Sequence, residues 1–314
     1  MRIGLHIGRF DWPGSPINIS EKLAEIATTA DDKGFYSIWV MDHLFQLGPE
    51  FGILHGPVEA PMLEGYSTIA YLAGLTQRIK LGLLVTCNFF RNPGLLVKIA
   101  STIDVLSGGR TYLGIGAGWF EREARGLGIP LPSSLSERFE RLEETLQIVH
   151  QMWAGNVEPF EGKHYQLTEP LNSPQPLSKP HPPILIGGGG EKKTLRLVAK
   201  YADACNFVMG TTLKGAGRLT ESLENGLDRL RRKLAILEQH CNDVGRSYSD
   251  IEKTVGTFIE LAPGAMDTTV VIKLCRELVK LGFQHIIFNM PNVHEIEPIE
   301  IIGREVIPQL ADIT

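Results

Sequence analysis

Cysteine is scarce in this chain, and its spacing carries no metal or redox signature. The sequence holds 4 cysteines among 314 residues, at Cys87, Cys205, Cys241 and Cys275. No two of them form the C-x-x-C pair typical of zinc sites and dithiol redox centres. Each lies in an apolar or helical context, where cysteine behaves as a small buried hydrophobic side chain. We therefore predict reduced thiols, with the alternative that Cys87 and Cys205, which end predicted strands, line a pocket.

An excess of positive charge and long apolar runs are also lacking. The formal net charge is -5 and the isoelectric point is about 6.0, unlike the basic surface that nucleic-acid binding requires. No apolar stretch approaches the roughly 20 residues that span a bilayer, and the first residues are typical of a strand rather than of a secretion signal. We expect a cytoplasmic protein that acts on a small-molecule substrate, with no nucleic-acid and no membrane partner.

Metal-ligand spacings and hydrolytic motifs are missing too. The histidines are scattered, without His-x-His or His-Glu-x-x-His spacing, so we predict no metal site. No Gly-x-Ser-x-Gly elbow supports a hydrolase. No lysine at a predicted strand end stands out as a Schiff-base former, which argues against a lyase or aldolase.

The sequence does contain a regular alternation of short β-rich runs with longer amphipathic segments. Eight such runs match the strand number of a closed (β/α)8 barrel, and the alternation leaves no room for separate domains. We predict one TIM-barrel domain over residues 1–314, of the α/β class. The predicted strands are Arg2–Ile7, Ser37–Met41, Ile79–Thr86, Tyr112–Gly116, Ile184–Ile186, Ala204–Val208, Lys253–Ile259 and His285–Asn289.

Helices are predicted between these strands from the spacing of apolar residues. Ser20 is expected to cap the first helix and Gly34 to end it. Residues 119–135 and 154–183 are too long for ordinary turns, so we expect insertions at the barrel mouth, the second beginning with a hairpin over residues 158–167. The predicted helices are Ser20–Gly34, Pro93–Leu106, Ser136–Trp153, Lys192–Ala202, Gly215–Val244, Thr268–Leu281 and Glu297–Leu310.

A glycine run follows the fifth predicted strand and precedes a predicted helix that starts near Glu191. Bare backbone amides at a helix N-terminus form a cradle for phosphate. We predict that the run holds the phosphate of a cofactor; the alternative is a tight turn without a ligand. The run consists of Gly187, Gly188, Gly189 and Gly190.

Asp42 and His43 place a carboxylate and an imidazole at the end of the second predicted strand. An imidazole can give or take a proton near neutral pH, which the oxidation of an alcohol or the reduction of a carbonyl requires. The alternative is structural, with Asp42 capping the following loop and His43 bound to backbone.

Small residues at the ends of the third and fourth predicted strands suggest a slot for a planar ring. Gly116 and Gly118 permit close approach, and Thr86 and Asn88 can hydrogen-bond to the edge of a ring. The competing interpretation is that the glycines only relieve crowding inside the barrel.

Several segments resemble the bacterial luciferase-like monooxygenase superfamily, and most closely its branch of oxidoreductases that use the deazaflavin coenzyme F420. The similarity covers the second to the sixth predicted strand in order. It lies in residues 34–43, which end in Asp42-His43, in Asn92-Pro93 with Ser107-Gly-Gly-Arg110, in residues 113–121, in residues 183–191 and in residues 201–206.

The resemblance implies a barrel with coenzyme F420 at its carboxyl-terminal face and a hydride transferred between the coenzyme and a small organic substrate. His43 would be the proton donor or acceptor, and we expect Asp42 to orient it. A cis peptide bond between Leu83 and Leu84 would lie behind the ring, with Thr86 near the polar edge of the ring. The glycine run would receive the phosphate. A homodimer is expected from the same resemblance.

The sequence gives only candidate residues for the contacts with the substrate. Trp119, Phe89, Phe90 and Phe258 are our candidates for the pocket wall, with a place in the core as the alternative. Trp119 stands where sugar-phosphate dehydrogenases of this branch carry a glutamate, which argues against their substrate. An FMN-dependent monooxygenase is the first alternative function, and a flavin-binding protein without turnover is the second.

Overall fold

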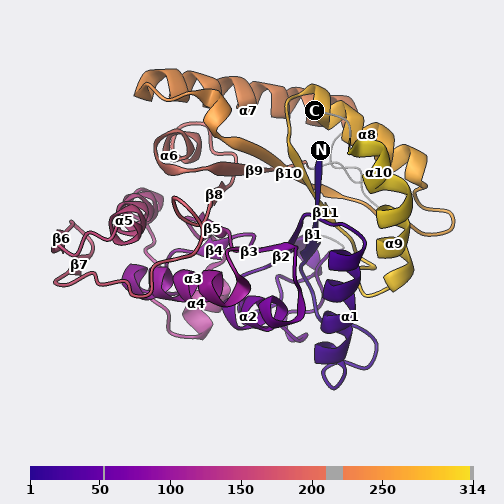
Figure 1. Cartoon of the computed structure of the whole chain (residues 1–314), viewed down its shortest axis with the longest axis horizontal. Helices are drawn as coiled ribbons and strands as arrows, with labels where there is room; N and C mark the ends of the chain where they lie inside the picture. Colours follow the sequence, from indigo (N-terminus) through magenta and orange to yellow (C-terminus); the bar gives the residue numbers. More distant parts are fainter. Residues whose placement is uncertain (52–53, 210–221, 312–314) are drawn as a thin grey trace.

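The structure, a computed structural model, describes residues 1–51, 54–209 and 222–311. Its centre is a parallel sheet of nine strand segments in the order β3-β2-β1-β11-β10-β9-β8-β5-β4. The segments β3 and β4 belong to one interrupted strand, and a bridge between Leu81 and Thr111 joins this strand to the chain entering β5. The sheet therefore curves round into the predicted (β/α)8 barrel, with helices outside it (Figure 1).

Seven of the eight predicted strands agree with the structure to within one residue at each end, and the exception is the third. The predicted strand Ile79–Thr86 is divided into two segments after Leu83, in the strand for which the resemblance implies a cis peptide bond. The strand segments of the barrel are β1 Arg2–Ile7, β2 Ser37–Val40, β3 Lys80–Leu83, β4 Thr86–Cys87, β5 Leu113–Gly116, β8 Ile184–Gly187, β9 Ala204–Val208, β10 Glu252–Phe258 and β11 His285–Asn289.

The outer helices follow the predicted order with a few differences. Two of them, α2 and α4, were not predicted, and part of the predicted helix Gly215–Val244 lies outside the described residues. Around the barrel the structure has α1 Ile19–Asp32, α2 Gly65–Leu75, α3 Pro93–Ser107, α4 Glu121–Gly126, α5 Leu135–Trp153, α6 Thr194–Tyr201, α7 Leu223–Val244, α8 Thr268–Lys280, α9 Ile296–Ile301, a π-helical turn over Ile302–Val306, and α10 Ile307–Leu310, with short 3-10 turns at Pro49–Phe51 and Tyr248–Asp250.

Helix ends follow local capping chemistry. Asn92 accepts a hydrogen bond from the Gly94 N–H, and Pro93 occupies the first turn of α3, where its missing N–H costs nothing. The predicted cap of α1 is wrong, because Asn18 rather than Ser20 precedes the helix. The helix ends before Gly34 as predicted, and this glycine has a φ of 84°, which favours glycine.

The two long connections differ in position. Residues 117–134 follow β5, so they lie at the carboxyl-terminal face and contain α4. Residues 154–183 follow helix α5 and contain the expected hairpin, β6 Phe160–Glu161 and β7 Gln166–Leu167. The hairpin packs beside α5 (Figure 1), where Glu144 accepts backbone N–H groups from Lys163 and Tyr165. The expected position of this second segment over the mouth is therefore wrong.

A polar network lies on the barrel strands below the site. Glu252 on β10 is contacted by Arg2 at 2.9 Å and by the Tyr112 hydroxyl at 3.0 Å, and Nδ1 of His285 lies 3.4 Å from its Oε1. Above this network Trp39, Tyr112, Leu185, Ala204 and Ile287 fill the interior, with Leu84 and Val85 packed against them. This packed layer separates the network from the carboxyl-terminal face. Among the described residues no helix is long and apolar enough to cross a membrane.

Candidate active site

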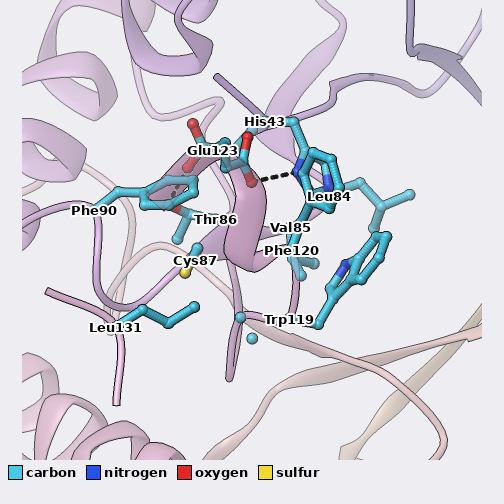
Figure 2. Close-up of a pocket in the computed structure, with 13 residues that line it drawn as sticks. His43, Leu84, Val85, Thr86, Cys87, Phe90, Trp119, Phe120, Glu123 and Leu131 are labelled. Atoms are coloured by element: carbon cyan, nitrogen blue, oxygen red, sulfur yellow. Dashed lines mark hydrogen bonds and ion pairs between the residues drawn. The ribbon is translucent and has the colours of Figure 1, made fainter. Parts of the chain in front are cut away.

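Two adjoining cavities open at the carboxyl-terminal ends of the strands. The smaller has an empty volume of about 600 Å³ and lies between the ends of β2, β4 and β5. The larger, of about 1160 Å³, extends across the barrel to β1, β8, β9 and β11. His43, Leu84, Val85 and Trp119 line both. In the view of Figure 2, Phe90 and Leu131 lie on one side of the smaller cavity and Trp119 on the other.

The interruption of the third strand shapes the wall between the cavities. The N–H of Leu84 still bonds to the Val40 carbonyl of β2, at 2.9 Å, so the strand keeps its pairing through Leu84. The cis peptide bond follows, between Leu84 and Val85. The prediction of a cis bond at Leu83–Leu84 is therefore wrong by one residue, since Leu83 is still paired with β2.

Neighbouring glycines make room for this interruption. A Cβ atom on Gly114 would lie 1.9 Å from the Leu83 carbonyl oxygen, and one on Gly116 would lie 2.9 Å from Val85 Cγ2. A Cβ on Gly187 would lie 2.7 Å from Val85 Cγ1. Relief of crowding therefore accounts for these glycines. Gly116 and Gly118 also line the smaller cavity, where the ring slot is predicted.

His43 is bound to a residue that we did not predict. Its Nδ1 lies 2.7 Å from Oε1 of Glu123 in α4 (Figure 2). Oε2 of this carboxylate accepts the N–H groups of Leu44 and Phe45, at 2.6 and 3.2 Å. Glu123 is only 1% exposed. The expectation that Asp42 orients His43 is therefore wrong, because Glu123 holds the imidazole.

Asp42 is engaged in a buried ion pair of its own. Arg91 contacts its two carboxylate oxygens at 2.7 and 3.0 Å, and the Thr86 hydroxyl donates to the same carboxylate. Arg91 also contacts Glu64. Burial by itself would lower the pKa of Arg91, but hydrogen bonds and the charge of Asp42 raise it, so the guanidinium is permanently charged. Thr86 lines the smaller cavity, but its hydroxyl donates its hydrogen bond to Asp42.

Six predicted site residues do not line either cavity. The side-chain amide of Asn88 is turned toward the protein, with the Gly116 carbonyl and the Leu142 N–H each at 3.2 Å once its orientation satisfies both groups. The others are Leu83, a residue of the core, and Phe89, Phe258, Gly189 and Gly190. Trp119 and Phe90 do line the smaller cavity, and the Trp119 ring centroid is 5.6 Å from that of His43.

The glycine run begins at the end of β8 and precedes α6, as predicted. A turn over residues 191–193 separates the run from α6, which begins at Thr194, two residues after the predicted start at Lys192. Gly187 and Gly188 line the larger cavity. The Nζ of Lys233 in α7 contacts the carbonyl oxygen of Gly189, which places a cation beside the run. The charge of Glu191 is balanced by Arg232 at 2.8 Å.

Apart from His43, the polar residues of the larger cavity were not predicted as site residues. They come from strands and loops far apart in the chain, and the one signal was a histidine inside the otherwise apolar first strand. Burial lowers the pKa of His6 to about 4, and burial with the charges of His43 and Arg9 does the same for His55. The polar residues that line the cavity are His6, Arg9, His43, His55, Asn206 and Asn289.

The profile of the luciferase-like monooxygenase family matches residues 5–264. The chain belongs to this family. Curated relatives of this luciferase-like chain include an F420-dependent glucose-6-phosphate dehydrogenase of Nakamurella multipartita, 26% identical over 92% of each chain. The pyrimidine monooxygenase RutA of Acinetobacter baylyi is 33% identical over 48% of this chain and 40% of its own.

Solved structures agree on the fold of the luciferase-like chain. The F420-dependent tetrahydromethanopterin reductase of Methanopyrus kandleri superposes with a TM-score of 0.76 and 17% identity over 98% of this chain and 99% of that one. An F420-dependent secondary alcohol dehydrogenase, solved with an F420–acetone adduct, superposes with a TM-score of 0.79 and 18% sequence identity over 99% of both chains. The predicted barrel and the family resemblance are confirmed.

Proposed function

We propose that this protein is an F420-dependent oxidoreductase that transfers a hydride between the coenzyme and a small organic substrate. The observation that carries the proposal is the pairing of His43 with buried Glu123 at the junction of the two cavities. Relatives of matching length, named as F420-dependent dehydrogenases, support the choice of coenzyme.

The site fits a flat ring with a phosphorylated tail. Leu84 and Val85 offer apolar surface to both cavities, and Gly188, with a φ of 115°, lines the larger cavity near the ammonium group of Lys233. We infer that Leu84, Val85, Gly116 and Gly118 hold the ring and that the glycine run with Lys233 binds the phosphate. When bound, coenzyme F420 supplies a ring carbon that exchanges hydride with the substrate.

The remaining chemistry belongs to His43. Because a carboxylate can only accept, Nδ1 must carry the proton in its hydrogen bond with Glu123. Nε2 is then the nitrogen that takes the hydroxyl proton of an alcohol or returns one to a carbonyl oxygen. Glu123 stabilises the imidazolium that forms, as a buried carboxylate does in other acid–base pairs. Asp42, paired with Arg91, acts by fixing the loop and the Thr86 hydroxyl.

An FMN-dependent monooxygenase is the second candidate function. The observation that favours it is the higher identity, 33%, of the pyrimidine monooxygenase over part of this chain. We rank it lower because that similarity covers 48% of the chain, against 92% for the F420-dependent dehydrogenase. Binding without turnover is the alternative of another class, and an intact His43–Glu123 pair argues against it.

Separate titrations of the apoprotein with coenzyme F420 and with FMN, followed by fluorescence quenching, test the proposal. We expect F420 to bind more tightly, and reduced F420 to be reoxidised when a ketone is added. A His43→Asn variant should bind F420 like the wild type but lose most of this turnover. Preference for FMN with oxygen consumption would establish the second candidate instead, and F420 binding without turnover of any alcohol or ketone would leave only a carrier.

Three further expectations remain proposals. We infer that residues 1–314 fold as one domain, that the protein forms a homodimer, and that it is cytoplasmic. The supports are the unbroken barrel for the first and the family resemblance for the other two. Limited proteolysis, sedimentation at several protein concentrations and cell fractionation would test them in that order.

A further inference from the structure

The floor of the larger cavity carries polar groups that the proposed mechanism does not use. His6 on β1 lies opposite Asn289 on β11 in the register of the parallel strands, and both line the cavity. If β3 and β4 are counted as one strand, the barrel has eight strands, and β1 is four strands away from β8 in both directions around it. His6 and Asn289 therefore lie across the barrel from the glycine run, where the cofactor's phosphate is proposed to bind.

One ring nitrogen of each of two histidines there lacks a partner, although the His6 imidazole also has a hydrogen bond with Asn289. Within the described part of the chain, Nε2 of His6 and Nδ1 of His55 are buried and make no hydrogen bond. A buried polar atom without a partner costs free energy, and native proteins keep few of them. Since both histidines line the same cavity, a polar atom of a bound molecule would satisfy them.

The charged residues around the cavity indicate which class of molecule could bind there. The residues described as lining it include no aspartate, glutamate or lysine, and Arg9 is the one permanently charged residue among them. Arg9 is bound through two nitrogens to both oxygens of Asp11, each at 2.6 Å. At the His6–Asn289 end, across the barrel from the glycine run and Lys233, a phosphate or carboxylate would lose its water without gaining an unpaired cation, which is unfavourable for a buried charge.

The rest of the lining is apolar. Met41, Leu47, Leu54, Trp119, Val208 and Met290 surround the polar floor. We propose that the His6–Asn289 end of the larger cavity binds an uncharged alcohol or ketone with an apolar body, and that His6 and Asn289 hydrogen-bond to a polar group of that molecule. The inference rests on the proposed function and deepens it by assigning the substrate class. It excludes sugar phosphates, the substrates named for several relatives.

Paired probes that share a carbon ring test the inference: cyclohexanone, which is uncharged, and cyclohexanecarboxylate, which is not. Each is titrated into protein labelled with 15N-histidine, alone and with coenzyme F420, and the His6 signals are assigned with a His6→Gln variant. We expect cyclohexanone to shift the His6 signals, and cyclohexanecarboxylate to bind at least about tenfold more weakly. Glucose-6-phosphate should bind no better than the carboxylate.

Variants separate recognition from folding. His6→Phe should weaken cyclohexanone binding by about tenfold, the effect of one good hydrogen bond, while His6→Gln, which can still donate and accept, should weaken it less. If His6→Phe does not fold, Asn289→Leu provides the same test. His164→Phe is the control, because His164 pairs with Glu140 beside the distant hairpin.

Equal or tighter binding of cyclohexanecarboxylate or glucose-6-phosphate would overturn the inference, as would unchanged His6 signals at saturating cyclohexanone. Failure of the proposed function would look different, because F420 would then not bind while the preference between the two ring probes could still be measured on the protein alone.

Discussion

His43 and Glu123 are 80 positions apart in the chain, and Nδ1 of the imidazole lies 2.7 Å from the carboxylate. The same carboxylate binds the backbone of Leu44 and Phe45. Glu123 thereby fixes both the loop that follows β2 and the histidine within this loop. We regard Glu123 as a positioning residue, since it acts on the substrate only through His43.

Replacing Glu123 by Gln tests this relationship. The amide keeps the size of the side chain but removes the charge that stabilises the imidazolium, so kcat should fall at least about 100-fold, with little change in the affinity for coenzyme F420. The 15N signals of His43 should also lose the strong preference for the Nδ1-protonated tautomer. Glu59→Gln, at an exposed pair with Arg122, should change neither quantity. Unchanged kcat and tautomer in Glu123→Gln would show that the contact is only structural.

Arg91 is expected to be essential for stability. Its partner Asp42 is fully buried, so Arg91→Met leaves a buried carboxylate without a cation, which should reduce the free energy of unfolding by about 3–5 kcal/mol. Urea denaturation measures the change. Arg231→Met, which breaks an exposed pair with Asp228, should cost less than about 0.5 kcal/mol. Adding Asp42→Asn to Arg91→Met should recover part of the loss, and a double variant less stable than Arg91→Met would contradict this account.

The barrel could be predicted because its signal is local and repeated. Each strand is a short apolar run that is followed by a helix with apolar residues on one face. Strands of a parallel sheet are buried on both faces, so each run can be recognised without knowing which strand it pairs with. The break in the third strand could not be found this way, since Leu83, Leu84 and Val85 continue the apolar run without a change of character. It depends on the room that Gly114 and Gly116 leave on the neighbouring strand.

The candidate site was predictable only in part. Asp42 and His43 follow a strand directly, and both line the smaller cavity as the strand end predicts. Glu123 was missed because it lies among Glu121, Arg122 and Arg125, a charged run typical of a solvated helix. Asp42 was assigned to the wrong partner for a related reason. Neighbours in sequence suggested an interaction, whereas the side chains of Asp42 and His43 bind Arg91 and Glu123.

Two glycines offer a matched test of the packing around the strand break. Gly114→Ala would bring Cβ to 1.9 Å from a backbone oxygen and should destabilise the protein by about 3 kcal/mol. At Gly74, inside α2, an added Cβ would meet no neighbouring atom within 4 Å, so Gly74→Ala should stabilise the protein by about 0.5–1 kcal/mol. Thermal unfolding of both variants measures the difference. Tolerance of alanine at position 114 would mean that the break is not packed against β5.

The network around Glu252 predicts how stability depends on pH. Burial alone would raise the pKa of Glu252, but the hydrogen bonds and charges of His285 and Arg2 lower it to about 2. The carboxylate is therefore more acidic in the folded state than in the unfolded chain, where its pKa is about 4.3. Its stabilising effect is complete above about pH 4.3 and is lost as the pH falls toward about 2.

The comparison of the wild type with Glu252→Gln isolates this effect, because all other titrating groups are common to both proteins. The difference in the free energy of unfolding should be largest above about pH 4.3 and should shrink by about 3 kcal/mol as the pH falls toward about 2. Urea denaturation at a series of pH values provides the measurement. A difference that stays constant through this range would mean that Arg2 and His285 do not hold the carboxylate in its charged form. Because the network lies below the packed layer of Trp39 and Leu185, we expect F420 affinity to be unaffected by Glu252→Gln wherever the variant is folded.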